Sequence, residues 1–565
     1  MRSNQSHCVA WGRTSLTVCA VILTASLASA GVPKMAKDLE GKKGSEPVDV
    51  IVQFTQAPTA RHHQKVLSKG GTLKNTLGLV NGASYTVPAS ALAALAADSD
   101  VAFIAPDRPL YTKNNGLPTA ELDYHTDTVN ASVAWAQGLD GTGIGVAVID
   151  SGIIDIPDFH GQNNRVVFSQ NFVDGTSGSA NDQYGHGSHV AGIIGGSGNK
   201  STGSNYFYTF KGIAPNVNLI DLRVLDENGV GTDSQVIAAI QMAIQLKSKY
   251  NIRVINLSLG RPVYESYKLD PLCQAVESAY GAGIVVVVAA GNDGRDNSAG
   301  TNGYGTITAP ANDPYVITVG AMKTMGTPSR ADDEITTYSS KGPTPIDHIV
   351  KPDVVAPGNR IISLYTAGLH LNQLYPGNEI PNSLYQTNGN RTASDTYYVL
   401  SGTSMAAPVV SGAVALMLQK SPSLKPDQVK ARLMKTASKT FPAYTSYTDP
   451  TSGITYTSQY DVLTIGAGYL DIQAALSSTD LSSGVAKSPT AQYDPATDGV
   501  YFVNDSSAMW GSSAMWGSTA VWGVNVFVGS QSAMWGSSAM WGSSAMWGSS
   551  TADGGETDLL IDGEN

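Results

Sequence analysis

Cysteine is nearly absent from this chain, with three occurrences in 565 residues. Cys8 and Cys19 lie within the first 30 residues, so a chain that has lost this segment keeps Cys273 alone. One cysteine cannot form an intramolecular disulfide, which excludes a small disulfide-stapled scaffold. We therefore expect the fold to be stabilised by packing, with bound ions as a further candidate contribution.

Charge is also scarce, since charged residues make up 14% of the chain. The net charge is −11, and the eight acidic residues after Lys487, where no Lys or Arg follows, supply −8 of it. The first 487 residues are thus nearly neutral, which argues against a nucleic-acid partner. Hydrophobic residues reach 42% and glycines number 59, a composition typical of a packed, turn-rich globular protein.

No long hydrophobic run is present at the N-terminus. Arg2 and Arg13 precede an apolar run over 16–27, which is shorter than the roughly 20 residues of a membrane-spanning helix. Ala28-Ser29-Ala30 follows as a small-x-small cleavage signal. We predict a cleaved signal peptide (1–30) rather than an anchor, a leader over 31–46, and a secreted mature chain without a membrane span.

A compact α+β unit is predicted next, over 47–111. Its pattern alternates short apolar strands with two helices, in the order βαββαβ. The expected elements are a strand at 48–54, a helix at 57–68, strands within 77–87 broken at Asn81-Gly82, a helix at 89–97 and a strand at 101–105. About sixty residues bury only a marginal core, so this unit needs a partner surface.

From 131 to 476, apolar strands alternate with helical stretches. Strands are expected at 144–149, 217–224, 254–259 and 284–290, and a helix at 234–246. The strand 284–290 lacks polar alternation, which indicates that both its faces are covered. We predict a doubly wound, mostly parallel sheet with flanking helices, whose ligands bind beyond the carboxyl ends of the strands.

A repeat-rich tail occupies 477–565. Ser-Ala-Met-Trp-Gly begins at 507, 513, 532, 538 and 544, and the variant Thr-Ala-Val-Trp-Gly begins at 519. Regularly spaced tryptophans suit two roles: a platform for a polysaccharide or cell-surface partner, or a stalk core in which they pack on one another. The sequence leaves both open.

Three segments between 131 and 476 carry candidate catalytic groups. They are Val148-Ile149-Asp150-Ser151-Gly152, Gly185-His186-Gly187-Ser188-His189-Val190-Ala191-Gly192 and Ser401-Gly402-Thr403-Ser404-Met405-Ala406-Ala407-Pro408. Each alone has a structural explanation: a turn carboxylate, a core histidine, and a Ser at a helix start. Together they supply a nucleophile, a base, and a carboxylate that orients the base.

These segments, in this order, resemble the subtilisin-like serine proteases, and the likeness covers 131–476. The resemblance implies a serine-type endopeptidase in which Ser404 is the nucleophile, His186 the base and Asp150 its orienter. In Ala289-Ala290-Gly291-Asn292-Asp293-Gly294 it makes Asn292 the side-chain donor of the oxyanion hole, beside the backbone N–H of Ser404.

The same resemblance implies how substrate binds. Ser258, Leu259 and Gly260 match an edge segment on which an extended peptide adds as a strand. Together with Ala289, Ala290 and Gly291 they would wall an apolar pocket, so we expect broad cleavage of proteins and peptides after large apolar or aromatic residues.

Metal chemistry is not expected. His186 and His189 with one carboxylate make a poor ligand set, and the serine chemistry needs no cofactor. Asp158 matches a calcium-ligand position of many subtilisins, whereas 196–210, which would supply further ligands, does not match. A structural calcium at Asp158 is therefore an open expectation.

The 47–111 unit resembles the inhibitor-type propeptide of the same family, on Val80-Asn81-Gly82 followed by Val87-Pro88-Ala89-Ser90-Ala91-Leu92-Ala93-Ala94-Leu95. The resemblance implies a folding aid that blocks the active site until self-cleavage between Pro109 and Leu122. A free-standing binding module is the alternative. His62-His63 is a candidate pH sensor, although a solvated surface position is the simpler interpretation.

Two other functions are alternatives for the whole chain. A catalytically silent binding protein would act through its tryptophan repeats, but no member of the catalytic set is substituted. A lipase-like hydrolase would carry its nucleophile in Gly-x-Ser-x-Gly, with Ser before Asp and His. The order here is reversed.

Overall fold

The computed structural model describes residues 34–39, 41–111, 122–161, 163–173, 178–389, 391–450, 452–482, 484–494, 499–503 and 564. The predicted signal peptide and the tryptophan repeats lie outside these ranges. Within them, no helix combines the length and the apolar character needed to cross a bilayer.

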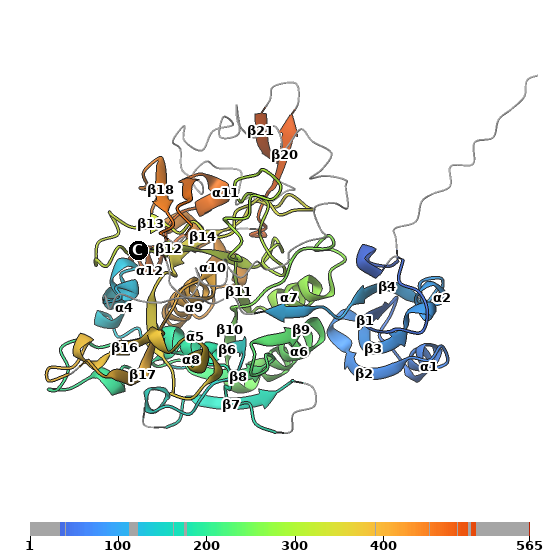
Figure 1. Ribbon diagram of the computed structural model, residues 1–565, viewed down its shortest axis with the longest axis horizontal. Coiled ribbons are helices and arrows are strands. Elements are labelled where there is room, and N and C mark those ends of the chain that lie inside the picture. Colours follow the sequence, from blue (N-terminus) through green and yellow to red (C-terminus); the bar gives the residue numbers. More distant parts are fainter. Residues whose placement is uncertain are drawn as a thin grey trace, which may run out of the picture. The chain divides into compact units, whose positions relative to one another are not determined.

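An eight-stranded sheet forms the centre of the molecule (Figure 1). Its strands are β6 (Gly145–Asp150), β7 (Val166–Asn171), β8 (Asn218–Arg223), β10 (Ile252–Leu257), β11 (Val285–Ala289), β12 (Ile317–Lys323), β13 (Glu334–Ile335) and β14 (Val354–Pro357). The order is β13-β12-β11-β10-β6-β8-β7, with β14 beside β12, and β13 is the one antiparallel member among these strands.

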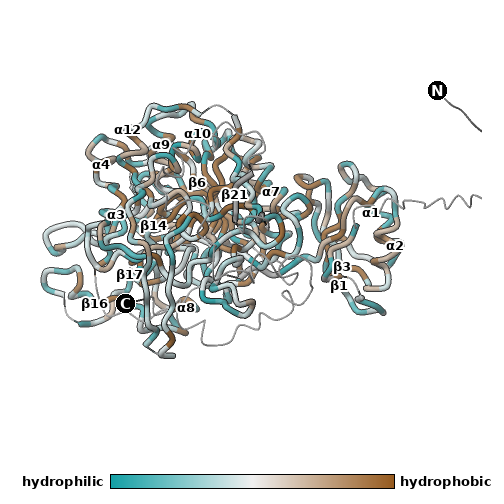
Figure 2. Tube along the Cα trace, turned by 90° about the horizontal axis from the view of Figure 1, so that it is seen from above, coloured by the Kyte–Doolittle hydropathy of each residue, from teal (hydrophilic) through white to brown (hydrophobic). Residues whose placement is uncertain are grey.

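Helices cover both faces of this sheet. Val146 and Val148 of β6 pack in one apolar cluster with α5 (His186–Gly195) and α9 (Thr403–Lys420). Ala147 and Ile149, which point to the opposite face, pack with α6 (Asp233–Tyr250) and α7 (Pro271–Gly281). Figure 2 shows the most hydrophobic segments in the interior around β6. The predicted doubly wound fold is confirmed.

Element boundaries differ modestly from the prediction. The strand expected at 254–259 is β10, which runs from Ile252 to Leu257, so Ser258 follows the strand directly. The helix expected at 234–246 extends to Tyr250 and ends at Asn251 in the left-handed region, with φ 47°.

The part of the chain that begins at residue 122 is called the body below. Several of its elements were not predicted. Besides β7, β12, β13, β14 and α7, they are α3 (His125–Thr128), α4 (Ala131–Ala136), β9 (Val230–Thr232), β15 (Ile361–Leu364), α8 (His370–Leu374), β16 (Glu379–Pro381), β17 (Ala393–Leu400), α10 (Pro426–Thr436), β18 (Tyr444–Thr448), β19 (Thr455–Gln459), α11 (Val462–Ile465), α12 (Ile472–Ser477), β20 (Thr490–Asp494) and β21 (Gly499–Val503). Most are short, so a periodic pattern has little length in which to show.

The N-terminal unit is a four-stranded antiparallel sheet with two helices (blue in Figure 1). Its elements are β1 (Pro47–Phe54), α1 (Ala60–Leu67), β2 (Thr72–Leu77), β3 (Gly82–Pro88), α2 (Leu92–Ala96) and β4 (Val101–Pro106). Asn81 takes the left-handed turn position before β3, at φ 51°. The predicted βαββαβ order is observed.

The end of this unit pairs with the body. β5 (Pro109–Tyr111) is antiparallel to β9 (Val230–Thr232), with Leu110 opposite Gly231. Just before β5, a carboxylate oxygen of Asp107 accepts the backbone N–H of Ser234 in the first turn of α6, at 2.8 Å. The next residue, Arg108, makes a bidentate ion pair with Glu265 at 2.6 and 2.7 Å.

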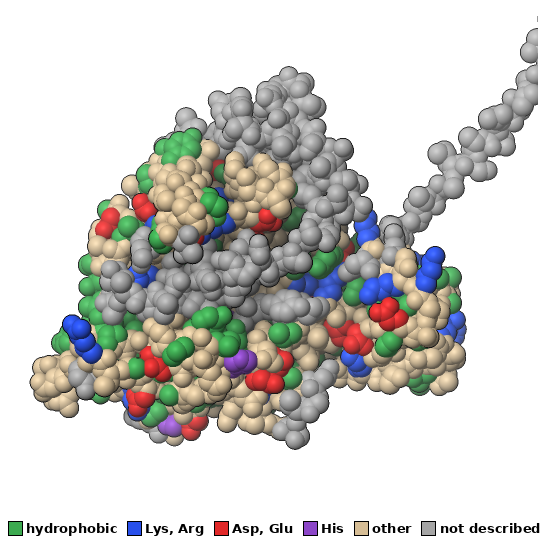
Figure 3. Space-filling view, viewed as in Figure 1, with side chains coloured by type: hydrophobic (Ala, Val, Ile, Leu, Met, Phe, Trp, Pro, Cys, Tyr) green, Lys and Arg blue, Asp and Glu red, His purple; other side chains and the backbone are tan. Residues whose placement is uncertain are grey.

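On the face shown in Figure 3, acidic and basic side chains are interspersed, and neither sign forms a continuous patch. The one free cysteine of the described residues, Cys273, is buried, and its thiol contacts the Asn312 carboxamide oxygen at 3.3 Å. Burial raises the pKa of this thiol well above its usual value, so it is inert.

Candidate active site

Asp150 is the last residue of β6, at the carboxyl end of the central sheet, and it is fully buried. One carboxylate oxygen accepts the backbone N–H of Ser151 at 2.8 Å and contacts His186 Nδ1 at 2.6 Å. A carboxylate in this place fixes the imidazole so that Nε2 faces the reacting groups. Asp150 and His186, predicted from separate motifs, are thus brought together.

The glycines around His186 are required by close packing. A Cβ on Gly187 would lie 2.2 Å from the carbonyl oxygen of Gly152, so the start of α5 can approach the Asp150 turn only without a side chain there. Gly185, with φ 112°, turns the chain into the helix. His186 is the first helical residue, and its Nε2 has no hydrogen-bond partner among the described residues.

Ser404 lies in the first turn of α9. It is two residues after Gly402, which has a positive φ and directly precedes the helix. Its hydroxyl donates to the carbonyl oxygen of Ser258 at 3.1 Å, and the Ser258 hydroxyl donates to the Ser404 carbonyl at 2.7 Å. The Ser404 hydroxyl is therefore bonded to the segment after β10 and, within the part of the chain that the structure describes, not to His186. Catalytic hydrogen bonds are often loose until substrate binds.

Asn292 follows β11 and is mostly buried, with 9% of its surface exposed. Its carboxamide oxygen accepts both the backbone N–H and the hydroxyl of Thr403, each at 2.9 Å. The amide nitrogen is consequently turned away from Thr403. This orientation suits a donor to an oxyanion formed at the neighbouring Ser404.

The two segments predicted to bind substrate, 258–260 and 289–291, both pack against Thr308. A Cβ on Gly260 would lie 2.7 Å from the Thr308 hydroxyl, and a Cβ on Gly291 would lie 2.8 Å from the Thr308 methyl group. Thr308 also donates its backbone N–H to the Ala290 carbonyl at 3.1 Å. The family resemblance places the far side of the pocket near Thr306–Ala311 but singles out no residue there, so Thr308 was not among the predicted pocket residues.

A second segment missed by the sequence analysis is β9. Its backbone already pairs with β5 from the N-terminal unit, so Val230–Thr232 is a strand edge that accepts an extended chain. Short strands of this kind carry no periodic signal, and only the fold brings the two segments together.

The surroundings of Asp158 do not fit a calcium ion. Its carboxylate oxygens accept backbone N–H groups from Gly198 at 3.0 Å and Lys200 at 2.7 Å. Calcium requires six to eight oxygen ligands, whereas these neighbours present hydrogen-bond donors. Within the described ranges, no cluster of three or more His, Cys, Asp or Glu side chains could hold a metal.

His189, the second histidine of its motif, serves packing. Its Nε2 lies 3.1 and 3.0 Å from the backbone carbonyls of Ile361 and Tyr398. Burial lowers the pKa of His189 to about 3, so the ring is neutral over the physiological range. A neutral imidazole that donates to two carbonyls is a structural group.

His62 is not a solvated surface residue, contrary to the simpler prediction. Its ring is 3% exposed and lies 5.0 Å from the ring of Phe54. Its Nδ1 accepts the backbone N–H of Thr59 at 3.0 Å, so the side chain caps the start of α1. His63 contacts the hydroxyl of Tyr85 at 2.7 Å.

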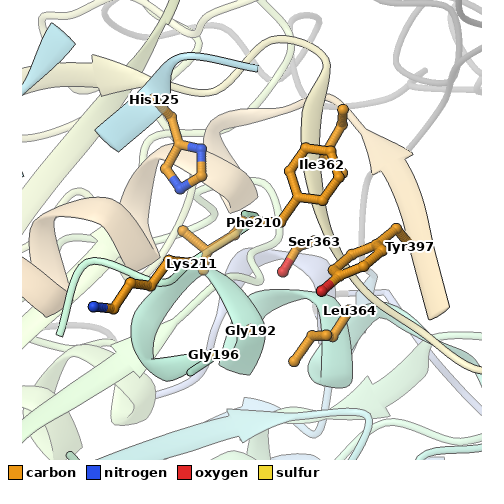
Figure 4. Close-up of a pocket in the computed structure, with 10 residues that line it drawn as sticks. His125, Gly192, Gly196, Phe210, Lys211, Ile362, Ser363, Leu364 and Tyr397 are labelled. Carbon is orange, nitrogen blue, oxygen red and sulfur yellow. The ribbon is translucent and has the colours of Figure 1, made fainter. Parts of the chain in front are cut away.

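A small internal cavity lies beside α5 (Figure 4). It is lined by His125, Gly192, Ile193, Gly196, Phe210, Lys211, Ile362, Ser363, Leu364 and Tyr397. It has room for about one water molecule. None of the predicted site residues lines it.

Known proteins with similar sequences indicate the class of protein to which this chain belongs. A model of the subtilase family matches residues 141–463. Serine protease AprX of Bacillus subtilis (strain 168) is 35% identical over 399 residues, covering 68% of this chain and 82% of that protein. Subtilisin E of the same organism is 32% identical over 407 residues, covering 71% and 88%.

Among solved structures, fervidolysin from Fervidobacterium pennivorans, described as a keratinolytic enzyme related to subtilisin, aligns with a TM-score of 0.56 at 22% identity. The alignment covers 80% of this chain and 64% of that one, which is under two thirds of its length. This likeness supports the fold. Together, the central parallel sheet and the matches to the subtilase family define a serine endopeptidase of the subtilisin-like class. The chain belongs to the subtilase family.

Proposed function

We propose that the chain cleaves peptide bonds through an acyl-enzyme intermediate formed on Ser404. The hydroxyl oxygen attacks the scissile carbonyl carbon, while His186 Nε2 takes the hydroxyl proton and passes it to the leaving amine. Water then hydrolyses the ester, again with His186 as base, which restores Ser404. The observation that carries this proposal is the buried Asp150–His186 contact at 2.6 Å.

Asn292 and the backbone N–H of Ser404 are the proposed donors to the oxyanion. Substrate is proposed to lie along Ser258, Leu259 and Gly260, with its side chain before the cut against Ala289, Ala290 and Gly291. An apolar wall of this kind favours large apolar or aromatic residues, and backbone pairing tolerates many sequences. No cofactor takes part in this chemistry.

The 47–111 unit is proposed to act as an intramolecular inhibitor until it is cut off. The pairing of β5 with β9 supports this role, because it lays the end of the unit along the body as an added strand. The cleavage that frees it would then fall after Tyr111 and before Leu122.

Export from the cell is proposed from the 1–30 segment, and the tail is proposed to hold the enzyme on a polysaccharide or a cell surface. A truncation that ends at Ser488 tests the tail. It should keep full proteolysis and lose retention on cells or polysaccharide. If retention is unchanged, the tail is not a binding platform, and the remaining hypothesis is a stalk in which the tryptophans pack on one another.

The central proposal is tested by comparing the parent with Ser404→Ala. The parent should process its precursor and digest an unfolded protein, whereas Ser404→Ala should do neither, with a loss of roughly a million-fold in kcat. If both forms mature and digest alike, the assignment of Ser404 is wrong.

A further inference from the structure

A hollow on the catalytic body holds the penultimate residue of the chain. Glu564 has a fully buried side chain, and three separate segments of the chain make hydrogen bonds to this residue. They contribute Arg295, from the loop after β11, Thr337, from the turn after β13, and Asn359, from the turn between β14 and β15.

The carboxylate of Glu564 is recognised by several donors. Its Oε1 accepts the backbone N–H of Thr337 at 2.8 Å, the hydroxyl of Thr337, and Nη2 of Arg295 at 3.0 Å. Lys323 Nζ lies 3.7 Å from Oε2. Hydrogen bonds to ionised groups are the stronger class, and here they form out of contact with water.

The backbone of Glu564 is recognised as well. The side-chain nitrogen of Asn359 donates to its carbonyl oxygen at 2.8 Å, and its own N–H donates to the Asn359 side-chain oxygen at 2.9 Å. One carboxamide therefore pairs with both polar groups of one residue. This contact selects a peptide over a free carboxylate.

The body orients Arg295 without help from the tail. Its Nε donates to the Thr337 hydroxyl at 2.6 Å, Nη1 pairs with Asp449 at 2.7 Å, and the guanidinium stacks 4.3 Å from the ring centre of Tyr456. These contacts fix three sides of the guanidinium and leave Nη2 directed at Glu564. A group positioned in advance loses little entropy when it binds.

The hollow adjoins the catalytic groups. Arg295 is three residues after Asn292, and Asn359 follows Gly358, whose carbonyl accepts the N–H of Gly402 at 2.7 Å. Gly402 is two residues before Ser404. The contacts of Glu564 thus join the segments that present the proposed oxyanion donor and the proposed nucleophile.

We propose that this hollow, formed by Arg295, Lys323, Thr337 and Asn359, is a binding site for a glutamate residue within a peptide, and that Glu564 is its intramolecular ligand. The tail is then attached to the body at both of its ends. A single cut between 504 and 563 does not release the C-terminal fragment, which stays bound through Glu564. This property goes beyond the proposed protease activity and does not depend on it.

The test uses the full chain carrying Ser404→Ala, so that self-digestion plays no part. A recognition sequence for a sequence-specific protease is inserted between Gly529 and Ser530, the chain is cut there, and gel filtration follows the C-terminal fragment. We expect the fragment to co-elute with the body. Glu564→Gln should speed its dissociation by roughly tenfold or more, because it removes a charge-assisted contact.

Glu556→Gln is the matched control, since it removes the same charge eight residues earlier, and it should leave retention unchanged. Amide exchange at Thr337 in the uncut chain gives a second measurement, and it should quicken with Glu564→Gln alone. The proposal is overturned if the parent fragment dissociates at once, if Glu564→Gln retains it as firmly as the parent, or if both substitutions release it equally.

Discussion

The carboxamide oxygen of Asn292 is held by Thr403, which donates both its backbone N–H and its hydroxyl at 2.9 Å. The residue beside the proposed nucleophile thereby fixes the orientation of the Asn292 carboxamide. Oxyanion stabilisation depends on donors that are oriented before the reaction begins. The Thr403 hydroxyl is consequently a positioning group for Asn292.

Thr403→Val should lower kcat by about tenfold with little change in KM, because one hydrogen bond that orients the Asn292 amide is lost while substrate contacts remain. Thr403→Ser keeps the hydroxyl and should keep kcat near that of the parent. Steady-state kinetics on a peptide substrate measures both. A Thr403→Val enzyme with parental kcat would show that the backbone N–H suffices.

The N-terminal unit should bind the body more tightly in acid. Burial raises the pKa of Asp107 to about 6, with the nearby Asp233 charge adding to the shift and the Ser234 bonds and Lys74 opposing it. A carboxyl whose pKa is raised on docking stabilises the docked state. This stabilisation is complete at pH values below the pKa of the free carboxyl, and it is lost as pH rises through the docked pKa of about 6.

Inhibition of the mature enzyme by the added 34–111 segment measures this effect. Between pH 5 and 7 the inhibition constant should rise about tenfold for the parent segment. For Asp107→Asn it should change much less, since the substituted side chain does not titrate. Tighter inhibition at pH 7 than at pH 5 would contradict the assignment to Asp107.

Asp353→Asn should lower the free energy of unfolding by about 3–5 kcal/mol, because it leaves two buried lysines without their carboxylate. Lys351 lies 2.7 Å and Lys430 3.1 Å from Asp353, and all three side chains are buried. Burial lowers the pKa of Lys430 to about 7, which reflects the cost of this charge.

Denaturant unfolding of the Ser404→Ala chain is the measurement for Asp353→Asn. Asp98→Asn is its control, because the Lys65–Asp98 pair is partly exposed and an ion pair in contact with water contributes little to stability. Equal losses from the two substitutions would mean that the buried cluster has no special role.

Peroxide should inactivate the enzyme through Met405. This fully buried side chain is adjacent to Ser404 in α9, and its sulfoxide would place a polar oxygen beside the proposed nucleophile. Met405→Ala should retain activity in peroxide, and Met405→Leu should do so while preserving side-chain volume. Met417→Leu, a buried methionine three turns further along the helix, is the control; protection by Met417→Leu alone would assign the damage elsewhere.

The sheet and the positions of Asp150, Asn292 and Ser258 were predictable because long apolar runs mark buried parallel strands, and polar residues directly after such runs lie at one edge. The start of α9 was predictable for a similar reason, since a long apolar helix follows Ser404. These features are local in the sequence.

Other features depend on contacts between distant segments. Thr308 meets Gly260 and Gly291, and Val230–Thr232 pairs with Pro109–Tyr111, although no pattern in either member of a pair points to the other. At Asp158 the sequence position resembles a calcium ligand, but only the fold shows that its carboxylate accepts backbone N–H groups from Gly198 and Lys200.

The hydrogen bond from the Ser404 hydroxyl to the Ser258 carbonyl bears on how the enzyme can be labelled. In the proposed mechanism, this bond must break and the hydroxyl proton must turn toward His186 before the oxygen can attack. A peptide that lies along Ser258–Gly260 competes for that backbone and favours the turn, whereas a small electrophile without a peptide portion does not. Affinity probes for this chain should therefore carry a peptide, and simple serine reagents should underestimate the fraction of active molecules.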